Sequence, residues 1–295
     1  MSVRRRDASV RLDRRLRELY PGASGRTIKQ WLERGRVRVA GQVIRRGDVA
    51  VAAPDRVELG APAPPAVLAP LRLLFEDEVI LVVDKPAGLL TIASDRERER
   101  TAYRLLAEYV GSHGRPGART PRPGPRLFIV HRLDRETSGV LVFAKSADAK
   151  RRLQGQFEAR AVERRYLAVV EGRPREASGR LTSRLRQDAS LRVRTTRDRR
   201  TSREAITDYR VLRPGAAMSL VELSLVTGRR AQIRVQLADL GHPIVGDRAH
   251  GARQDPLRRL CLHATRLAFT HPRGSRVTFE SPAPESFTHL AARGA

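Results

Sequence analysis

The residues that could do chemistry lie in a short polar segment between two apolar runs, with the sequence His131-Arg132-Leu133-Asp134-Arg135-Glu136-Thr137-Ser138-Gly139. Apolar runs of this length are typical of strands, so we expect Asp134 on a turn held by a rigid scaffold, where catalytic groups are commonly placed. A carboxylate there could act as a nucleophile or as a base. The alternative is structural, because a turn aspartate often binds nearby backbone N–H groups.

The elements that would hold this segment are mostly short apolar runs of the kind that form strands. Eight such runs follow residue 70: Leu71–Phe75, Val79–Val83, Leu127–Val130, Val140–Ala144, Tyr166–Val170, Ala205–Leu212, Leu220–Val226 and Val277–Glu280. Helical spacing interrupts them near residues 101–110, 147–160 and 230–240. The segment 111–126 is rich in Gly, Pro and Arg, which indicates a loop. We therefore predict one β-rich domain over residues 71–295.

The first 60 residues predict a separate small unit, two helices followed by short strands. The second helix begins after Ser24 and ends at Gly35, and valines then alternate with arginines, as in a strand with one wet face. Residues 61–70 are uncharged and rich in Pro and Ala, which is typical of a semi-rigid linker. The predicted organisation is therefore a domain over 1–60, a linker over 61–70, and the larger domain.

The chain of 295 residues carries 58 Lys and Arg against 32 Asp and Glu, a formal net charge of +26. With 40% hydrophobic residues it can build cores, so the charge lies on folded domains and favours a polyanion, above all nucleic acid. The single cysteine, Cys261, excludes an internal disulfide framework and a multi-cysteine metal site. No apolar run approaches the ~18 residues that span a membrane, and the N-terminus lacks the pattern of a signal peptide. We expect a soluble, cytoplasmic protein.

Five ordered segments together resemble one enzyme family. The segment His131–Gly139, followed by Val140–Ser146, is similar to the signature of the RluA-type pseudouridine synthases. In that family's order, the other segments are Val83–Leu89, Arg165–Val169, Thr227–Arg234, and Gly241–Asp247 with Leu262–Ala264. The resemblance covers residues 71–290. The first 60 residues in turn resemble the RNA-binding domain first seen in ribosomal protein S-four.

The resemblance implies a role for each matching residue. Asp134 matches the essential catalytic aspartate, Tyr166 the tyrosine that stacks on the target base, and Arg234 the arginine that pairs with the aspartate. Arg132 matches the arginine that enters the space left by the flipped nucleotide. The reaction breaks an N-glycosidic bond, turns the uracil over and rejoins it through a ring carbon, so no metal and no redox cofactor is expected.

The resemblance also implies a fold and a partner. The fold is α+β, a small RNA-binding domain followed by a catalytic domain built on a large, mostly antiparallel mixed sheet with flanking helices. The partner is structured RNA, which we expect Arg26, Lys29 and Arg36 of the first domain to contact. Ribosomal RNA of the large subunit is favoured, because RluA-type enzymes with this N-terminal domain often act there, and transfer RNA stays open. No protein partner is implied, and we expect a monomer.

Two rival functions and two departures from the family remain. The rivals are a non-catalytic RNA-binding or ribosome-assembly protein and a hydrolase acting on a nucleoside bond. A pure binder has no need for Asp134, Tyr166 and Arg234 together, and a hydrolase would need a placed base to activate water, whereas no extra acidic pair accompanies the signature. The family commonly has histidines where this chain has Ala231 and Gln236, which predicts altered hydrogen bonding beside the active-site arginine.

Overall fold

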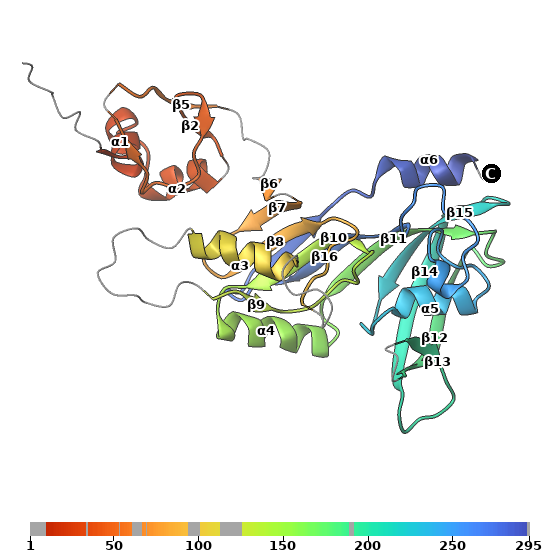
Figure 1. The fold of residues 1–295 in the computed structure, drawn as a ribbon. Helices are drawn as coiled ribbons and strands as arrows, with labels where there is room; N and C mark the ends of the chain where they lie inside the picture. Colours follow the sequence, from red (N-terminus) through yellow and green to blue (C-terminus); the bar gives the residue numbers. More distant parts are fainter. Residues whose placement is uncertain are drawn as a thin grey trace, which may run out of the picture. The chain divides into compact units, whose positions relative to one another are not determined.

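The computed structural model describes residues 10–33, 35–52, 54–60, 67–68, 70–93, 101–112, 126–188 and 192–293. The chain divides into two compact units, Met1–Ala66 and Val67–Ala295 (Figure 1). Of the predicted linker, residues 61–66 and 69 lie outside the described residues. Val67 and Leu68, which we had assigned to the linker, instead form strand β6 of the second unit. Most of the predicted loop over 111–126, namely residues 113–125, also lies outside the described residues.

The first unit is built from two short helices and five short strands among its described residues. The elements are β1 (Val10–Arg11), α1 (Leu12–Leu19), α2 (Gly25–Glu33), β2 (Val37–Val39), β3 (Gln42–Val43), β4 (Ala50–Val51) and β5 (Val57–Leu59). Ser24 caps α2 as predicted, because its hydroxyl accepts the Thr27 N–H at 3.1 Å. The strands pair as β1 with β4 and in the order β3-β2-β5. Leu12 and Leu16 of α1 pack with Ile28 and Leu32 of α2 in one core.

The second unit is built on a twelve-stranded sheet in the described residues, with the path β13-β12-β14-β15-β11-β16-β10-β8-β7-β6 and with β17 and β9 beside β16 and β10. The strands are β6 (Val67–Leu68), β7 (Leu71–Glu76), β8 (Ile80–Lys85), β9 (Phe128–Ile129), β10 (Ser138–Ala144), β11 (Glu163–Glu171), β12 (Ser178–Gln187), β13 (Val193–Thr195), β14 (Arg203–Arg213), β15 (Met218–Leu225), β16 (Leu262–Thr270) and β17 (Arg276–Glu280). All these pairs are antiparallel except β10 with β16. The predicted α+β class with a mostly antiparallel mixed sheet is confirmed.

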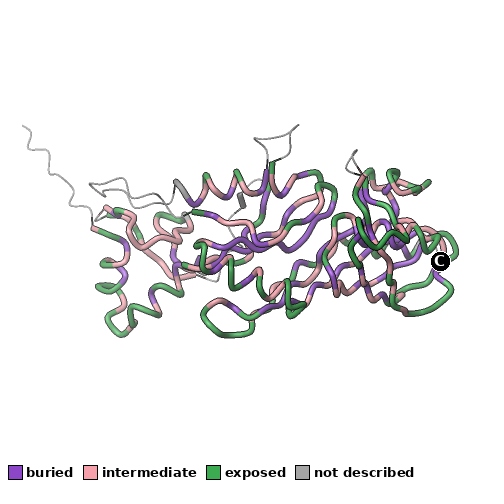
Figure 2. The backbone as a smooth tube through the Cα atoms, turned by 90° about the horizontal axis from the view of Figure 1, so that it is seen from below, coloured by how far each residue is buried: buried purple, intermediate pink, exposed green. Residues whose placement is uncertain are grey.

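Helices cover both faces of this sheet because its central strands are apolar on both sides. The helices are α3 (Ala102–Ser112), α4 (Ala147–Glu158), α5 (Gln232–Asp239), α6 (Glu285–Arg293) and the short 3₁₀ turn Arg248–His250. Along β8 and β10, alternate residues enter two separate cores. The backbone of such strands is coloured as buried in the middle of the sheet in Figure 2. One core contains residues of α3 and α6 and the other contains residues of α4. No described helix has the length and apolar character needed to cross a membrane.

The one parallel pairing brings the chemistry-bearing loop against the centre of the sheet. Ser138 and Gly139 at the start of β10 pair with His263 and Ala264 of β16. Gly139 has a φ of +116°, and a Cβ atom there would lie 2.2 Å from the Ala264 carbonyl oxygen. Only glycine tolerates that approach. The loop before β10 is therefore held beside β16 and, through it, β11.

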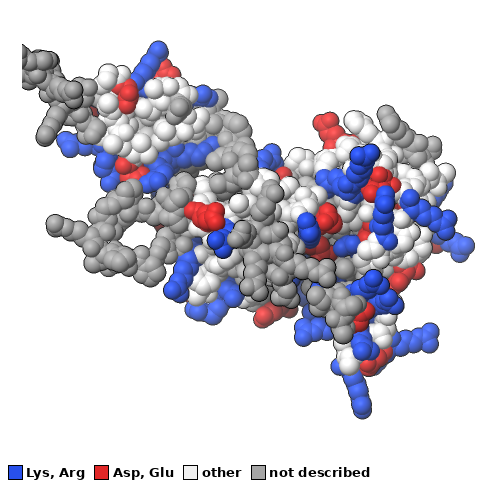
Figure 3. All heavy atoms as spheres, viewed as in Figure 1, with Lys and Arg blue, Asp and Glu red and all other residues white. Residues whose placement is uncertain are grey.

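Basic side chains gather at the end of the sheet formed by β12 and β13, which Figure 3 shows as projecting blue atoms. The exposed arginines on β13 and on the connection to β14 are Arg192, Arg194, Arg197, Arg199 and Arg200. We call β12, β13 and the connection from β13 to β14 the arm. Its strands alternate arginine with small or apolar residues, so one side of the arm is charged and exposed to solvent. A surface of this sign attracts polyanions.

Candidate active site

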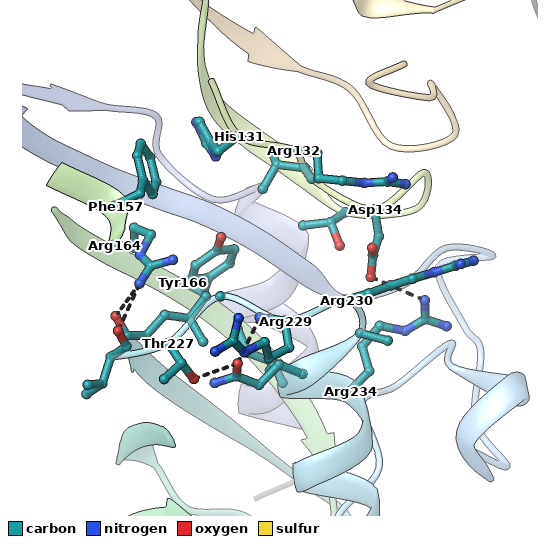
Figure 4. A pocket seen from close by; sticks show the side chains of 18 of the residues that line it. His131, Arg132, Asp134, Phe157, Arg164, Tyr166, Thr227, Arg229, Arg230 and Arg234 are labelled. Carbon is teal, nitrogen blue, oxygen red and sulfur yellow. Dashed lines mark hydrogen bonds and ion pairs between the residues drawn. The ribbon is translucent and has the colours of Figure 1, made fainter. Parts of the chain in front are cut away.

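A cavity of about 800 Å³ opens in the second unit beside the loop that carries Asp134 (Figure 4). The loop before β10, strand β11 and the segment between β15 and α5 build its wall. Two acidic residues, Asp134 and Glu158, line it together with six arginines: Arg132, Arg160, Arg164, Arg229, Arg230 and Arg234. Among the described residues, no three His, Cys, Asp or Glu side chains are grouped as metal ligands would be. The cavity is thus strongly cationic.

The loop that carries Asp134 is fixed through its backbone. Thr91 accepts the N–H of Leu133 at 3.2 Å and donates its hydroxyl to the carbonyl of the same residue at 2.8 Å. Lys85, which is fully buried, donates to the carbonyl of Arg135 at 3.1 Å. Its other two hydrogen bonds go to the carbonyls of Pro86 and Leu89, in the segment that follows β8. One ammonium group thus joins this segment to the loop that carries Asp134. The residues on both sides of Asp134 are therefore held.

The Asp134 carboxylate itself takes no part in shaping this turn. The turn is closed by the Thr137 N–H, which binds the main-chain carbonyl of Asp134 at 3.2 Å. Among the described residues, Arg234 is the ionic partner of the carboxylate, which accepts no backbone N–H. The carboxylate thus lines the cavity and makes none of the backbone hydrogen bonds that a purely structural turn aspartate would make among the described residues.

Arg234, on the first turn of α5, lies between two carboxylates. Its Nε and Nη2 donate to Asp247 at 2.7 Å each, and its Nη1 lies 3.7 Å from Oδ2 of Asp134. The expected pairing with Asp134 is present as an ion pair, but the closest partner is Asp247. Planar guanidinium groups favour such two-point binding, which fixes the side chain.

Asp247 is a site residue whose role the sequence did not indicate. Its side chain is 1% exposed, and it also accepts Nδ1 of His250 at 2.9 Å. Burial alone would raise the pKa of Asp247, but the hydrogen bonds from Arg234 and His250 hold it below the usual range. The same pairing raises the pKa of Arg234 against the opposing effect of burial. The pair is a fixed, charged anchor behind Asp134.

Tyr166, on β11, forms the middle of the cavity wall, between Phe157 and Arg164 on one side and Asp134 on the other (Figure 4). It is 8% exposed, and burial raises the pKa of its hydroxyl to about 12. The phenol is therefore protonated at neutral pH and can donate a hydrogen bond. The β11–β16 register shifts between Arg165 and Tyr166, which marks a bulge at this residue. Bulges often redirect a side chain beside a functional site.

Arg164 is a buried arginine that the sequence analysis did not single out. Its guanidinium lies 5.5 Å from the centre of the Phe157 ring, and its Nη2 donates to the carbonyls of Leu225 and Val226 at 3.2 and 3.1 Å. A Cβ on Gly228 would lie 2.4 Å from its Nη1, so glycine makes room for it. No described acidic residue pairs with it. A strand arginine normally lies on a solvated face, and its burial follows only from the loop that closes over it.

His131 stacks on the same aromatic ring at the edge of the cavity. The ring centres of His131 and Phe157 lie 4.8 Å apart, and the His131 Nε2 accepts the N–H of Val142 at 3.2 Å. Burial lowers the pKa of His131 to about 3. Because Nε2 accepts a hydrogen bond, the ring is neutral and His131 serves as a structural support of the loop.

Arg132 and Arg230 are exposed at the edge where this cavity meets a second one of about 570 Å³. In Figure 4 both side chains extend away from the Phe157 end. Neither has an acidic partner among the described residues. The second cavity reaches from Asp134 to Arg192 and Arg194 at β13. A basic surface thus continues from the loop that carries Asp134 to the arm.

Two buried glutamines fix the start of α5. Gln232 accepts the Arg229 N–H at 3.0 Å and the Thr227 hydroxyl at 2.9 Å, and Gln236 donates to Ala205, Ser183 and Leu181 on β14 and β12. Gln236 is 3% exposed and does not line the main cavity. The residue replacing a family histidine at position 236 is therefore a fully bonded support. The other, Ala231, does line the cavity, in a left-handed conformation with φ of +51°.

The three candidate RNA-contacting residues of the first unit lie on α2 and just after it. Arg26 and Lys29 are exposed on α2, three residues apart and therefore neighbours on one helix face. Arg36 is half-buried, and its Nε donates to the Gly60 carbonyl at 3.0 Å. Arg36 thus has a structural contact, and Arg26 and Lys29 are the more exposed of the three.

Comparison with known proteins points in one direction. A family profile described as RNA pseudouridylate synthase matches residues 79–239. An uncharacterised RNA pseudouridine synthase of Aquifex aeolicus is 33% identical, over 94% of this chain and 91% of the relative. The ribosomal large subunit pseudouridine synthase D of Pseudomonas aeruginosa is 34% identical, over 95% of this chain and 90% of the relative.

The fold gives the same result. The solved structure of human RNA pseudouridylate synthase domain containing 4 matches with a TM-score of 0.59 and 26% identity, over 75% of this chain and 92% of that one. A second human structure, RNA pseudouridylate synthase domain containing 1, matches with the same TM-score and 25% identity, over 75% of this chain and 87% of that one. The resemblance first drawn from five short segments is thus supported over most of the chain.

Proposed function

The chain belongs to the RNA pseudouridylate synthase family, as an isomerase of the RluA type, and we propose that it acts on large-subunit ribosomal RNA with Asp134 as its catalytic residue. In this reaction the bond between N1 of uracil and C1′ of ribose breaks and a bond between C5 and C1′ forms. One proton leaves C5 and one is gained at N1, so no atom is added or lost overall.

The observation that carries the assignment of Asp134 is that its carboxylate makes no hydrogen bond to the backbone among the described residues and lines the cavity. The carboxylate faces the cavity, takes no part in its own turn, and lies 3.7 Å from a guanidinium. The backbone on both sides is tied down, so the group is pre-positioned. A carboxylate in this place can attack the sugar, attack the ring, or remove a sugar proton, and each path needs the negative charge that Arg234 stabilises.

Tyr166 and Arg132 supply the two remaining requirements of the proposal. Reaching a uridine in structured RNA means taking it out of the base stack, which costs a few kcal/mol. Arg132 is exposed beside Asp134, where its side chain can occupy the vacated space. Tyr166 then offers an aromatic face and a protonated hydroxyl in the cavity wall. A mostly buried ring also helps to keep water from a broken glycosidic bond.

The ribosomal target rests on the relatives. Those from Pseudomonas aeruginosa and Yersinia pestis are named for the large ribosomal subunit and match nearly the full chain. Mapping pseudouridine in total RNA from cells with and without this gene tests the proposal. Loss of sites confined to large-subunit ribosomal RNA is expected, and loss in transfer RNA instead would overturn the target. We propose a cytoplasmic location on the same basis, since these relatives named for the large ribosomal subunit are bacterial.

The first unit is proposed to be an RNA-binding domain of the ribosomal protein S-four type that supplies affinity and not chemistry. The exposure of the basic residues Arg26 and Lys29 on one face of α2 supports this. In the full chain, changing both residues to Gln should weaken RNA binding and flatten its salt dependence, since fewer counterions are released. Turnover at saturating enzyme should be unchanged. Unaltered affinity and salt slope would remove the assignment.

The monomer state is proposed on the same footing. Asp134, Tyr166, Arg132 and Arg234 line one cavity within a single chain, so the proposed chemistry needs no residue from a second copy. Light scattering of the purified protein should give a mass near 33.0 kDa. A dimer that stays intact on dilution to the concentrations used for turnover would contradict this.

A further inference from the structure

The end of the cavity away from Asp134 collects arginines whose charges are poorly compensated. Arg160, Arg164 and Arg229 line it together with one exposed acidic residue, Glu158, and the ion pair that this cluster makes among the described residues joins Arg160 to Glu204 at 3.5 Å. Arg229 donates its Nε to the main-chain carbonyl of Glu204 at 3.1 Å and has no described ionic partner. Burial, together with repulsion from Arg203 and Arg160, lowers the pKa of Arg229. Like charges held this close are relieved by an anion.

Arg164 has donors left over in this cluster. The two carbonyl bonds of Arg164 both use Nη2, and its Nε is buried with no described partner. Its Nη1 lies beside Gly228, where any larger residue would collide with it. The residue is 8% exposed and lines the cavity. A guanidinium with spare donors, stacked on Phe157 and screened from water, binds an anionic oxygen more strongly than an exposed one.

Arg160 is kept in an unfavourable backbone conformation at the same place. It follows the C-cap of α4 with φ of +58°, in the position where helices usually end with glycine. The N–H of Ala161 completes the helix end by binding the carbonyl of Gln156 at 2.9 Å. Glycine would satisfy this turn with less strain. Arg160 is therefore present at a cost in backbone strain, and the ion pair of its side chain among the described residues is the exposed one with Glu204.

We propose that Arg160, Arg164 and Arg229 form a phosphate subsite that holds one phosphodiester of the RNA strand next to the target uridine. This deepens the proposed function and rests on it. In Figure 4 Tyr166 lies between Arg164 and Asp134, so a base stacked on it has the reacting sugar on the side of Asp134 and Arg164 on the other side, and Arg160 and Arg229 line the same cavity. Three guanidinium groups suit the tetrahedral, doubly accepting oxygens of a phosphate better than a single base carbonyl.

A charge-neutralisation experiment tests the subsite. Short RNAs that carry the mapped uridine are made with one uncharged methylphosphonate at each position in turn, and Kd is measured for the wild type and for Arg229→Gln. At one position near the uridine, the wild type should lose about tenfold or more in affinity. Arg229→Gln should lose affinity for the unmodified RNA but little more with that methylphosphonate. Additive losses at every position would overturn the subsite.

Arg213→Gln is the matched control, since Arg213 is exposed at the far end of β14, about 30 Å along the strand from Glu204. It should keep the full methylphosphonate effect. The salt dependence of binding to purified large-subunit ribosomal RNA gives a second readout that needs no turnover. Its slope should fall by about one in Arg229→Gln relative to Arg213→Gln. Equal slopes in the two variants would contradict the subsite.

Arg160→Gly separates a binding role from a structural one. Glycine relieves the left-handed strain, so Tm should not fall, while RNA affinity should drop as in Arg229→Gln. A variant with lower Tm and unchanged affinity would contradict a binding role for Arg160. If the wild type forms no pseudouridine in any RNA, the proposed function fails. If the enzyme is active but the methylphosphonate effect at every position is the same in the wild type and in Arg229→Gln, only the subsite is overturned.

Discussion

The two ends of the main cavity differ in how their positive charge is compensated. At one end Arg234 is bonded twice by the buried Asp247 and faces Asp134 at 3.7 Å, so one cation meets two anions. At the other end, among the described residues, the three cations Arg160, Arg164 and Arg229 meet two exposed carboxylates, those of Glu158 and Glu204, and only Glu204 forms an ion pair with one of them. The first end holds its own charges in fixed positions, as a reacting site requires. The second is short of negative charge, as a site for an anionic strand would be.

This contrast indicates a division of labour within one cavity. The hydrogen-bonded pair of Arg234 and Asp247 has balanced charges, so it contributes little to the attraction of RNA. Its contribution is to hold Arg234 in a fixed position beside Asp134. An unbalanced cluster gains most when a phosphate enters, so its value lies in affinity. Tyr166 separates the two ends, and changes on either side of it should affect different measurements.

Outside Asp134 itself, the largest effect on this comparison is expected from Asp247→Asn. The change removes the charge that anchors Arg234 while leaving Asp134 in place, and misplacing a catalytic group by about 1 Å can cost about 100-fold in rate. The variant should also be destabilised, because the mostly buried Arg234 guanidinium loses its charged two-point partner and keeps only the longer ion pair to Asp134. Single-turnover rate and Tm measure the two effects. A variant with normal rate would show that the anchor is irrelevant to the chemistry.

Substitutions of Tyr166, which lies in the middle of the cavity wall, should affect both RNA binding and turnover. Tyr166→Ala removes the aromatic face, whose stacking with a base is worth roughly 1–3 kcal/mol, so RNA carrying the target should bind about 5- to 150-fold more weakly. Tyr166→Phe keeps the face and removes the hydroxyl. If Tyr166→Phe binds normally but turns over slowly, the hydroxyl takes part in proton transfer. Wild-type behaviour of Tyr166→Ala would mean that the residue is core packing.

The smallest effect is a pH dependence of stability at His131, which supports the Phe157 end. In the folded protein its pKa is lowered to about 3, whereas the unfolded chain takes up the proton near 6.5. The unfolded state therefore binds more protons between these values, and stability falls as the pH drops from about 6.5 towards 3. His131→Gln, which can still accept the Val142 N–H, should lose about 1–3 kcal/mol less than the wild type over that range. Equal slopes in urea unfolding would contradict this.

The sequence predicted most strands of the second unit but missed two long ones. Strand β16 is central, yet its residues include His263 and Thr265, which interrupt the apolar pattern. His263 is accommodated because its Nδ1 meets the Ser138 hydroxyl at 2.8 Å and its Nε2 lies 3.1 Å from the Ser281 carbonyl. Strand β12 carries arginine, serine and threonine with only two leucines, so its composition resembles that of a loop. Strand β16 is formed by pairing with β10 and β11, which are distant in the sequence, so local pattern could not indicate it.

The same limit applies to the site. Asp134, Tyr166, Arg132 and Arg234 were chosen from short segments, and the structure brings all four to one cavity. The pairing of Arg234 with Asp247 spans thirteen residues and a change of direction, so no spacing rule predicts it. Arg164 was missed for a physical reason, since an arginine on a strand is usually solvated. Only the approach of Gly228 and the carbonyls of Leu225 and Val226 buries it.

The central claim is that one end of the cavity does the chemistry and the other holds the strand. The most direct test measures RNA affinity and single-turnover pseudouridine formation, at saturating enzyme, for Asp134→Asn and for Arg229→Gln. Asp134→Asn should lose at least about 1,000-fold in rate and bind as well as the wild type or better, because one repulsive charge is gone. Arg229→Gln should bind about tenfold more weakly and, once saturated, react at the normal rate. A folded Asp134→Asn protein with near-normal rate, or an Arg229→Gln protein slowed at saturation with unchanged affinity, would contradict the account.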